Sequence, residues 1–298
     1  MQELPNPTFP ISQLAQFGRL PFWRPHAGPA RVAVPPARLV DAGSATVDVA
    51  RDERTATGGL TVSWARHLDD VRAAQRLRFE VFAGEMGARL SASIEGHDID
   101  LFDDFCEHLL VRDDATQQVV GTYRVLTPAQ ARRIGSTYSD TEFDLTRLRD
   151  LRERMVELGR SCVHRDHRQG GVIMALWGAL AGFMHRNRLD TMIGCASIPM
   201  AHNGVHGGDA AASIWRQLSA THMAPIQYQV PPRLPLPIES LDSQLDVEPP
   251  ALIRGYLRLG AKVLGAPAWD PDFNSADLPM LMRIADLPPR YRKHFLGR

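Results

Sequence analysis

One glutamate in this chain is placed where it could accept a proton from an amine. The run from Glu157 to Val163 can alternate as a β-strand, with Glu157, Gly159, Ser161 and Val163 on one face and the residues between them on the other. A glutamate at a strand end that faces a cleft can serve as a general base. The pattern therefore predicts Glu157 as a catalytic base for an amine substrate.

A glycine-containing turn follows that strand and precedes an apolar helix. Arg168, Gly170 and Gly171 stand directly before the apolar run 172–183. Glycine allows backbone N–H groups to point outward at the start of a helix, and such groups favour an anionic ligand. The turn is therefore a candidate binding site, although a strand–turn–helix unit that only packs would show the same pattern.

The totals of the sequence exclude several classes of protein. The 298 residues suit one large domain or two small ones. The 34 lysines and arginines equal the 34 aspartates and glutamates, so the totals give no support to nucleic-acid binding. Three cysteines, far apart and odd in number, indicate a reducing compartment without a disulfide framework.

Residues 1–58 are expected to form a proline-rich N-terminal arm without long helices. Four arginines before Asp41 oppose one glutamate, and aromatic residues lie among them: Arg19, Arg24, Arg31, Arg38, Glu3, Phe9, Phe17, Phe22 and Trp23. Such an arm could lie on an anionic membrane surface or pack across the domain. There is no secretory signal, and the run 172–183 is too short to span a bilayer. We expect a cytoplasmic protein, soluble or peripheral at a membrane.

Periodicity and turn residues predict a mixed α/β sheet in residues 59–298. Asp69 or Asp70 could cap its first helix, and a C-terminal extension begins at about residue 199. Strands are expected at 60–65, 108–112, 119–126, 157–163, 191–197, 226–230 and 278–284, and helices at 69–84, 129–134, 172–188, 210–221 and 249–259.

The glutamate strand and the turn after it resemble the GNAT superfamily of N-acyltransferases. In that superfamily a Gln/Arg-x-x-Gly-x-Gly/Ala turn binds the pyrophosphate of the acyl donor. Arg168-Gln-Gly-Gly171 matches the first part of this motif, but Ile173 replaces its final small residue and is expected to crowd a coenzyme A pyrophosphate. The resemblance therefore favours a carrier-protein thioester as donor, bound by Val163, Arg168, Gly170 and Gly171.

Four blocks in order resemble the autoinducer-synthase and ornithine-lipid branch of the superfamily. These blocks are Arg78-Phe-x-Val-Phe82, Asp98-x-Asp100-x-Phe102-Asp103, Val120-Gly-Thr-Tyr-Arg124 and Glu157-Leu-x-Arg160. The chain continues beyond the length of homoserine-lactone synthases through 252–261 and Asp270-x-Asp-Phe273, which resemble the L-ornithine Nα-acyltransferases of bacterial ornithine-lipid synthesis. The resemblance covers roughly residues 60–295. It implies a GNAT-like fold with a mixed, mostly antiparallel sheet flanked by helices.

The same resemblance implies a reaction. A 3-hydroxyacyl group would pass from acyl carrier protein to the α-amine of L-ornithine, giving lyso-ornithine lipid at the inner face of the cytoplasmic membrane. The acyl-carrier thioester would be a co-substrate, and no cofactor would be bound tightly. The basic segment from Arg290 to His294 could contact an acidic carrier protein or lipid headgroups, or it could be a solvated helix end.

Catalytic roles follow from the resemblance for one strand. Glu157 would be the general base, acting directly or through a water. Backbone N–H groups near Ser161 to Val163 would stabilise the tetrahedral oxyanion. Cys162 lies in this stretch but lacks a clear base partner, so a core position is expected ahead of a covalent acyl-cysteine.

Acceptor-binding roles are implied for the charged residues of the four blocks. Asp100 and Asp103 would bind the ammonium groups of a dibasic amino acid. Arg124 or Arg160 would bind its carboxylate, for which a bidentate guanidinium is well suited. Arg78 would support the acidic residues. The alternative for each aspartate is a loop cap or a surface charge, and for the arginines it is a structural ion pair with those aspartates.

Two other functions stay open. One is a related enzyme that acylates glycine or another amino acid, or that makes an acyl-homoserine lactone. The other is a non-catalytic GNAT-like module that binds a carrier protein or lipid. No metal site is predicted, because the histidine pairs His164/His167 and His202/His206 have no accompanying ligand set.

Overall fold

A computed structural model of the chain describes residues 55–90, 94–169 and 171–296. Nearly all of the predicted N-terminal arm at 1–58 lies outside these ranges, and so does Gly170. Within the described ranges, no helix combines the length and the apolar composition that a membrane crossing requires.

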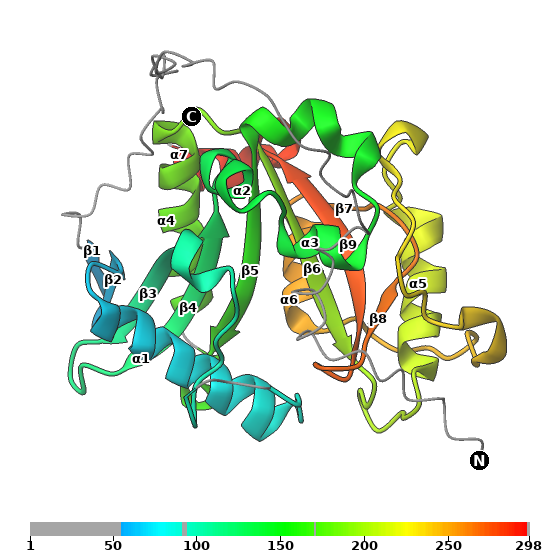
Figure 1. The fold of residues 1–298 in the computed structure, drawn as a ribbon, viewed down its shortest axis with the longest axis horizontal. Helices are drawn as coiled ribbons and strands as arrows, with labels where there is room; N and C mark the ends of the chain where they lie inside the picture. The colour runs from blue at the N-terminus through cyan, green and yellow to red at the C-terminus, as the bar shows by residue number, and fades with distance from the viewer. Residues whose placement is uncertain (1–54, 91–93, 170, 297–298) are drawn as a thin grey trace, which may run out of the picture. The chain divides into compact units, whose positions relative to one another are not determined.

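A mixed β-sheet forms the centre of the described structure (Figure 1). Its strands lie in the order β1-β2-β3-β4-β5-β6-β9-β7, and β8 pairs with β9 from outside that path. Among the described strands only β5 and β6 pair in parallel, so the predicted mixed and mostly antiparallel sheet is confirmed. The strands are β1 Thr55–Thr57, β2 Leu60–Trp64, β3 Glu107–Asp113, β4 Val119–Leu126, β5 Met155–Val163, β6 Thr191–Pro199, β7 Lys262–Val263, β8 Ala268–Asp270 and β9 Ser275–Arg283.

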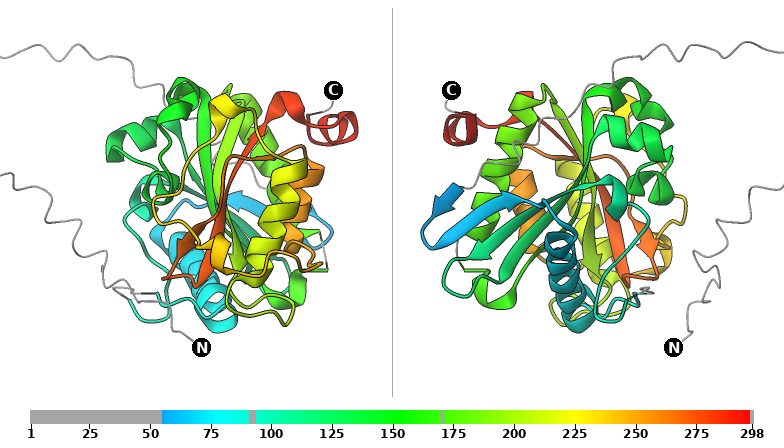
Figure 2. Two further views of the ribbon diagram at one scale, coloured as in Figure 1. Left: turned by 90° about the vertical axis from the view of Figure 1, so that its right-hand side faces the viewer. Right: turned by 60° about the vertical axis from the view of Figure 1, so that its left-hand side comes forward.

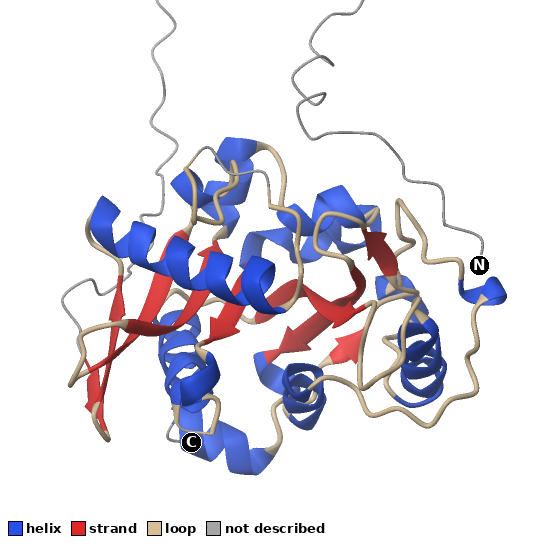
Figure 3. Ribbon diagram, turned by 90° about the horizontal axis from the view of Figure 1, so that it is seen from below, coloured by secondary structure: helices blue, strands red, loops and turns tan. Residues whose placement is uncertain are grey.

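Helices cover both faces of the sheet, as Figures 1 to 3 show from different sides. The face that α1 and α3 cover is called the α1 face; α1 contacts β3, β4 and β5, and α3 contacts β6. The opposite face is called the α4 face and is covered by α4, α5 and α6. The helices are α1 Leu68–Phe79, α2 Pro128–Ile134, α3 Tyr138–Glu142, α4 Val172–Arg186, α5 Asp209–Thr221, α6 Ala251–Arg258 and α7 Pro289–Leu296.

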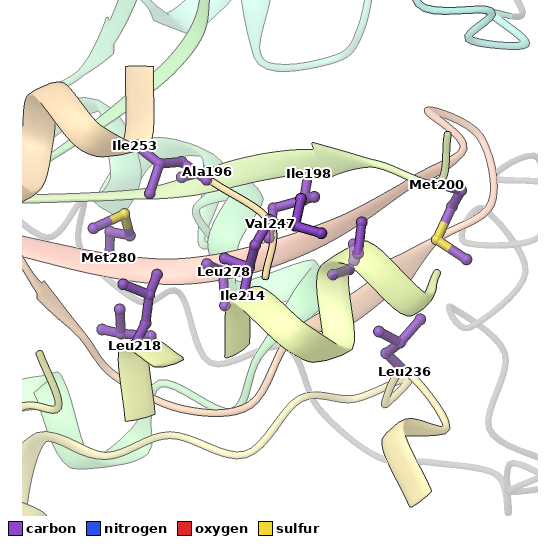
Figure 4. Close-up of a cluster of buried hydrophobic side chains, with 14 of the residues drawn as sticks. Ala196, Ile198, Met200, Ile214, Leu218, Leu236, Val247, Ile253, Leu278 and Met280 are labelled. Atoms are coloured by element: carbon purple, nitrogen blue, oxygen red, sulfur yellow. The ribbon is translucent and has the colours of Figure 1, made fainter. Parts of the chain in front are cut away.

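Apolar side chains fill the α4 face in two clusters. One lies between β2–β6 and α4 and includes Tyr123 and Leu176. The other lies between β6, β9, α5 and α6 and includes Ile198, Ile214 and Leu278 (Figure 4). Burial of this apolar surface accounts for the association of helices and sheet. Most of the buried charged side chains lie instead on the α1 face, which makes that face the place to look for chemistry.

Two predicted elements differ from the structure. The predicted helix 69–84 is α1 followed by a π-helix, Glu80–Glu85, and neither predicted aspartate caps it. Asp70 instead accepts a hydrogen bond from the Arg66 backbone N–H (3.0 Å) and pairs with Arg112 (2.6 Å). The predicted strand 226–230 is wrong; it is a 3-10 turn, Ile226–Tyr228, in a segment bounded by prolines that cannot donate to a ladder.

The C-terminal extension is part of the same sheet. β9, predicted as the strand 278–284, pairs with β6 along its whole length, from Ser275 opposite Pro199 to Arg283 opposite Thr191. β7 and β8 both pair with β9. The extension therefore brings side chains of β8 and β9 onto the α1 face beside β6.

Candidate active site

Glu157 lies at the point where two neighbouring strands separate. β5 and β6 pair over a three-residue stretch that ends with Glu157 opposite Ile193, although both strands continue beyond it. A side chain on Gly194 would collide with the carbonyl oxygen of Leu158, so glycine permits this close crossing. A cavity of about 50 Å³ lies there, with Leu158, Ile193 and Gly194 in its lining. Its lining also includes Tyr123 and Met280 of the two apolar clusters, so the cavity lies on the α4 side of the strand separation.

The carboxylate of Glu157 is buried and held by the start of α3. Its side chain accepts hydrogen bonds from the backbone N–H groups of Tyr138 (2.8 Å) and Ser139 (2.6 Å). Burial raises the pKa of Glu157 above its usual value, and the hydrogen bonds from Ser139 and Tyr138 and the charge of Arg124 oppose this rise only in part. A carboxylate whose pKa is shifted towards neutrality is a better proton acceptor for catalysis.

A β-bulge interrupts β5 at Arg160. Arg160 has a φ of 51°, and Arg160 and Ser161 together lie opposite Tyr123 alone. The left-handed backbone costs energy for a residue other than glycine. The side chain is held in return, because the guanidinium lies over the rings of Tyr138 (4.8 Å) and Phe273 (4.4 Å).

The bulge changes which residues of β5 share a face. Cys162 lies on the α1 face with Glu157. Ser161 forms a hydrogen bond with Tyr123, and Val163 packs against the α4 cluster, so both lie on the α4 face. The prediction that Ser161 and Val163 share the face of Glu157 is therefore wrong. One extra residue reverses the alternation of every position after it.

Six charged residues of the predicted motifs meet on the α1 face as the Arg–Asp ring. The members are Arg78, Arg124, Arg160, Asp98, Asp100 and Asp103. Each arginine pairs with two aspartates and each aspartate with two arginines, so the three positive and three negative charges balance. Arg78, fully buried at the end of α1, pairs with Asp98 (2.8 Å) and Asp103 (2.7 Å).

The other two arginines come from neighbouring strands and close the ring. Arg124 of β4 pairs with Asp103 (2.9 Å) and Asp100 (2.6 Å). Arg160 of β5 pairs with Asp100 (2.9 Å) and Asp98 (3.1 Å). Asp98 belongs to the acidic motif, but it was not among the predicted binding residues. Its role depends on contacts that are distant in sequence.

The ring holds its carboxylates in the ionised state. Burial alone would raise the pKa of Asp103, but the charges of Arg78 and Arg124 outweigh it and hold this pKa well below its usual range. The pKa of Asp100 is also lowered, because Arg124 and Arg160 outweigh burial. The predicted binding residues are thus paired with one another, and their contact with a substrate stays a prediction.

Cys162 lies in a small apolar cluster under α1. Its neighbours include Leu77 and Phe82, and 6% of the residue is exposed. Burial raises the pKa of the Cys162 thiol to about 12, so its nucleophilic thiolate is scarce at neutral pH. These surroundings are those of a packing residue.

The predicted donor loop leads from β5 to α4. Arg168 donates to the carbonyl of Val163 (3.1 Å) and pairs with Glu85 at the end of the π-helix (2.9 Å). Gly171 is the N-cap of α4. Ile173 packs against the α4 cluster, and its crowding of a coenzyme A pyrophosphate stays a prediction.

A hollow of about 600 Å³ lies beside the first turn of α4. Its lining includes Gly171 and three carboxylates, those of Asp113, Asp114 and Asp166. Carboxylates so placed oppose the binding of a doubly charged pyrophosphate.

A second acidic group lies on the α1 face beyond Glu157 and is called the carboxylate cluster. It consists of Glu142 at the end of α3, Asp270 of β8 and Asp277 of β9. Tyr138 links it to α3, because its hydroxyl donates to Asp270 (2.9 Å). In the sequence, the motif that begins at Asp270 contributes only to the family resemblance. Asp277 carries a signal that could have identified it as a site residue, because it is an acid inside an apolar strand. Glu142 gave no signal in the sequence.

Comparison with known proteins places this site in a family. A family model described as an acetyltransferase (GNAT) domain matches residues 77–178. An L-ornithine N(alpha)-acyltransferase of Brucella abortus (strain 2308) is 35% identical over 256 residues, which cover 80% of this chain and 89% of that protein. One of Agrobacterium fabrum is 34% identical over 259 residues, which cover 80% and 86%.

The chain belongs to the L-ornithine Nα-acyltransferase family. It is therefore an N-acyltransferase with a GNAT-type domain, and the predicted family, fold and enzyme class are confirmed. The GNAT match includes the Arg–Asp ring, Glu157 and Glu142 and ends before β8 and β9. The family relationship covers more of the chain than that domain alone.

The solved structures that resemble this chain have lower sequence identity to it than these relatives. A CoA-dependent acyl-homoserine lactone synthase, BjaI, is 16% identical with a TM-score of 0.45, covering 78% of this chain and 82% of that one. FeeM, an N-acyl amino acid synthase from uncultured soil microbes, is 11% identical with a TM-score of 0.44, covering 76% and 94%. Likenesses at these values do not bear on the substrate of this chain.

Proposed function

We propose that the protein transfers a 3-hydroxyacyl chain from acyl carrier protein to the α-amine of L-ornithine, giving lyso-ornithine lipid. The family relationship is the observation that carries this proposal, because its members in the comparison are L-ornithine Nα-acyltransferases. The position of Glu157 at the separation of β5 and β6 supports it. Acyl carrier protein and L-ornithine would be its partners.

Glu157 acts as the general base in this proposal. The α-ammonium of ornithine must lose a proton before its nitrogen attacks the thioester carbonyl carbon. Glu157 takes that proton, directly or through a water; the new C–N bond forms, the C–S bond breaks, and the thiol leaves protonated. The raised pKa of Glu157 makes its carboxylate a stronger base than an exposed glutamate, which favours proton transfer from the amine.

The separated part of β5 supplies the setting for the thioester. Beyond Glu157 the edge of β5 that faces β6 has no pairing with that strand, so N–H groups there are free of that ladder. Those near Ser161 to Val163 would stabilise the oxyanion. Ser161 and Cys162 enter this step through their backbone.

The Arg–Asp ring fixes the arginines that could receive the acceptor carboxylate. Asp100 and Arg160 are the more exposed members of the ring, with side chains 21% and 9% exposed. Arg124 is 4% exposed and so less accessible. Arg160 is therefore the better placed of the two predicted arginines, and its guanidinium suits bidentate binding.

A carrier-protein donor fits the charge around α4 and the C-terminus. The carboxylates in the hollow at Gly171 disfavour a pyrophosphate, and the guanidinium of Arg168 is already paired with Glu85. The terminal helix α7 carries exposed basic residues, including Arg290 and Lys293. A basic surface of this kind complements an acidic carrier protein and, at the cytoplasmic membrane, anionic headgroups.

The test is lipid extraction from a host that lacks ornithine lipids, expresses this chain and receives labelled ornithine. The expected product is a labelled species with one 3-hydroxyacyl chain. Glu157→Gln should lower its rate of formation by about 10²- to 10⁴-fold, the usual contribution of a general base. Glu153→Gln, which changes an exposed glutamate just before β5, should leave the rate unchanged.

Other outcomes point to the other functions. An acylated glycine or a lactone in place of acylated ornithine would keep the enzyme class and discard the acceptor. If the folded protein acylates no amine with a competent carrier present, the proposed reaction is wrong. If Glu157→Gln keeps full activity, the reaction stands and the base is a different group.

A further inference from the structure

The carboxylate cluster has negative charge without counter-ions. Within the described residues, no lysine, arginine or histidine forms an ion pair with Glu142, Asp270 or Asp277. In the Arg–Asp ring on the same face, every carboxylate faces two guanidinium groups. Buried charges in proteins are normally paired, so an unpaired group requires an explanation.

Asp277 shows the imbalance most clearly. The residue is 2% exposed, in the middle of the sheet. Its carboxylate accepts hydrogen bonds from the hydroxyl groups of Ser275 (2.9 Å) and Ser197, which carry no charge. Burial, together with the nearby charge of Asp270, raises the pKa of Asp277 to about 7. Among the described residues, the hydrogen-bond donors to this buried carboxylate are therefore neutral hydroxyl groups.

Glu142 faces the same space from α3. Burial and the charges of Asp270 and Asp277 raise the pKa of Glu142 to about 8. Arg233, a cation close to this end of α3, uses its Nε to donate to the carbonyl of Asp140 (2.7 Å). The three carboxylates therefore repel one another, and the exposed Asp272 beside Asp270 adds to this repulsion.

The neighbours of the cluster do not neutralise it. Tyr138 of α3 donates its hydroxyl to Asp270, and Cys195 of β6 has its pKa raised by burial and by the nearby carboxylates. Arg160 is the cation of β5 on this side, and its guanidinium is already paired with the aspartates of the ring. The cluster thus keeps a net negative charge.

Ser139 connects the cluster with the proposed base. Its backbone N–H donates to Glu157, and its hydroxyl lies 3.7 Å from the sulfur of Cys195. Cys195 in turn is close enough to Asp277, Glu142 and Glu157 for all three charges to act on its thiol. Tyr138 joins the same two places, because its backbone N–H donates to Glu157 (2.8 Å) and its hydroxyl donates to Asp270 (2.9 Å).

We propose that Glu142, Asp270 and Asp277 bind the distal ammonium of the dibasic acceptor while its α-amine lies at Glu157. This inference rests on the proposed function and names the residues that select ornithine against amino acids with uncharged side chains. An ammonium supplies the missing positive charge and can donate to several carboxylates at once. Within the described ranges, histidine, cysteine and carboxylate groups do not come together as a metal-ligand set.

The experiment compares L-ornithine with L-norvaline, which lacks the terminal amine, as acceptors for the purified chain with a 3-hydroxyacyl carrier protein. The native protein should prefer ornithine in kcat/KM by about 100-fold or more. Asp277→Asn and Glu142→Gln should each lower kcat/KM for ornithine by about 10- to 100-fold, mainly through KM, and leave norvaline within about 3-fold. Glu239→Gln removes an exposed carboxylate elsewhere in the C-terminal extension and should change neither value.

The results separate this inference from the proposed function. Equal losses with ornithine and norvaline in both variants, or no loss in either, would overturn the ammonium site while ornithine acylation stands. If the native protein acylates neither acceptor, the proposed function fails and the inference fails with it. The activity with norvaline shows in the same assay that each variant is folded.

Discussion

The Arg–Asp ring and the carboxylate cluster lie on the same face of one sheet, yet they give the same residue type opposite properties. Burial alone would raise the pKa of Asp103, but Arg78 and Arg124 hold it well below its usual range. Asp277 is as deeply buried, and burial beside Asp270 raises its pKa to about 7. The neighbours, not the depth, decide the ionisation. A balanced group is complete within the protein, whereas an unbalanced one has capacity for a ligand.

The largest expected effect comes from opening the ring. Arg78→Met keeps the length of an apolar stem and removes the charge, which leaves Asp98 and Asp103 buried with one guanidinium each. The free energy of unfolding should fall by about 3–5 kcal/mol, the usual result of removing one member of a buried ion pair. Urea denaturation measures this loss. Arg76→Met, an exposed arginine of the same helix, should cost less than about 0.5 kcal/mol.

Removal of a charge from the carboxylate cluster should increase the free energy of unfolding at pH 8, whereas opening the ring should decrease it. The pKa of Asp277 is raised on folding, so its contribution to stability is complete below about pH 4 and is lost as the pH rises through about 7. Asp277→Asn should therefore flatten the decline of the unfolding free energy in this window. At pH 8 it should be the more stable protein, by on the order of 2 kcal/mol. A loss of stability at pH 8, like that expected for the ring, would mean that Asp277 has a cationic partner in the protein.

The sequence predicts those parts of the site that depend on local pattern. The strands that became β2 to β6 and the apolar helix α4 follow from period and turn residues. Glu157 stands at the strand separation because a local motif placed it on the central strand. The four motif blocks contain all six ring members, five of which were predicted as binding residues.

The parts that were missed depend on contacts distant in sequence. A bulge at Arg160 cannot be read from an alternating pattern, and it moved Ser161 and Val163 to the other face. The partners of Asp100 come from β4 and β5, so the sequence could not tell a substrate site from a closed ring. The carboxylate cluster joins α3, β8 and β9, and only the fold brings them together.

The pH dependence of ornithine binding should distinguish the carboxylate cluster from the Arg–Asp ring. If the cluster binds the distal ammonium as proposed, it does so in its ionised form, and the affinity for ornithine should increase as Asp277 and Glu142 lose their protons between pH 6 and pH 8. The expected increase is about tenfold, with protons released on binding at pH 7. Calorimetry in two buffers of different ionisation enthalpy measures both quantities. Asp277→Asn should weaken this pH dependence, and a pH-independent affinity of the native protein would place the ammonium elsewhere.

The smallest expected effect is the one that compares the two groups directly. Asp100 is the most exposed aspartate of the ring, and Asp100→Asn leaves Arg124 paired with Asp103 and Arg160 paired with Asp98. Its cost in unfolding free energy should be about 1 kcal/mol, because solvent replaces part of the lost interaction. With the distal ammonium at the cluster, as proposed, the preference for ornithine over norvaline should stay within about 3-fold of the native value. If the preference instead collapses in Asp100→Asn and survives in Asp277→Asn, the ring binds the ammonium and must open to do so. In that case charge balance in the unliganded protein would not distinguish a structural group from a binding site.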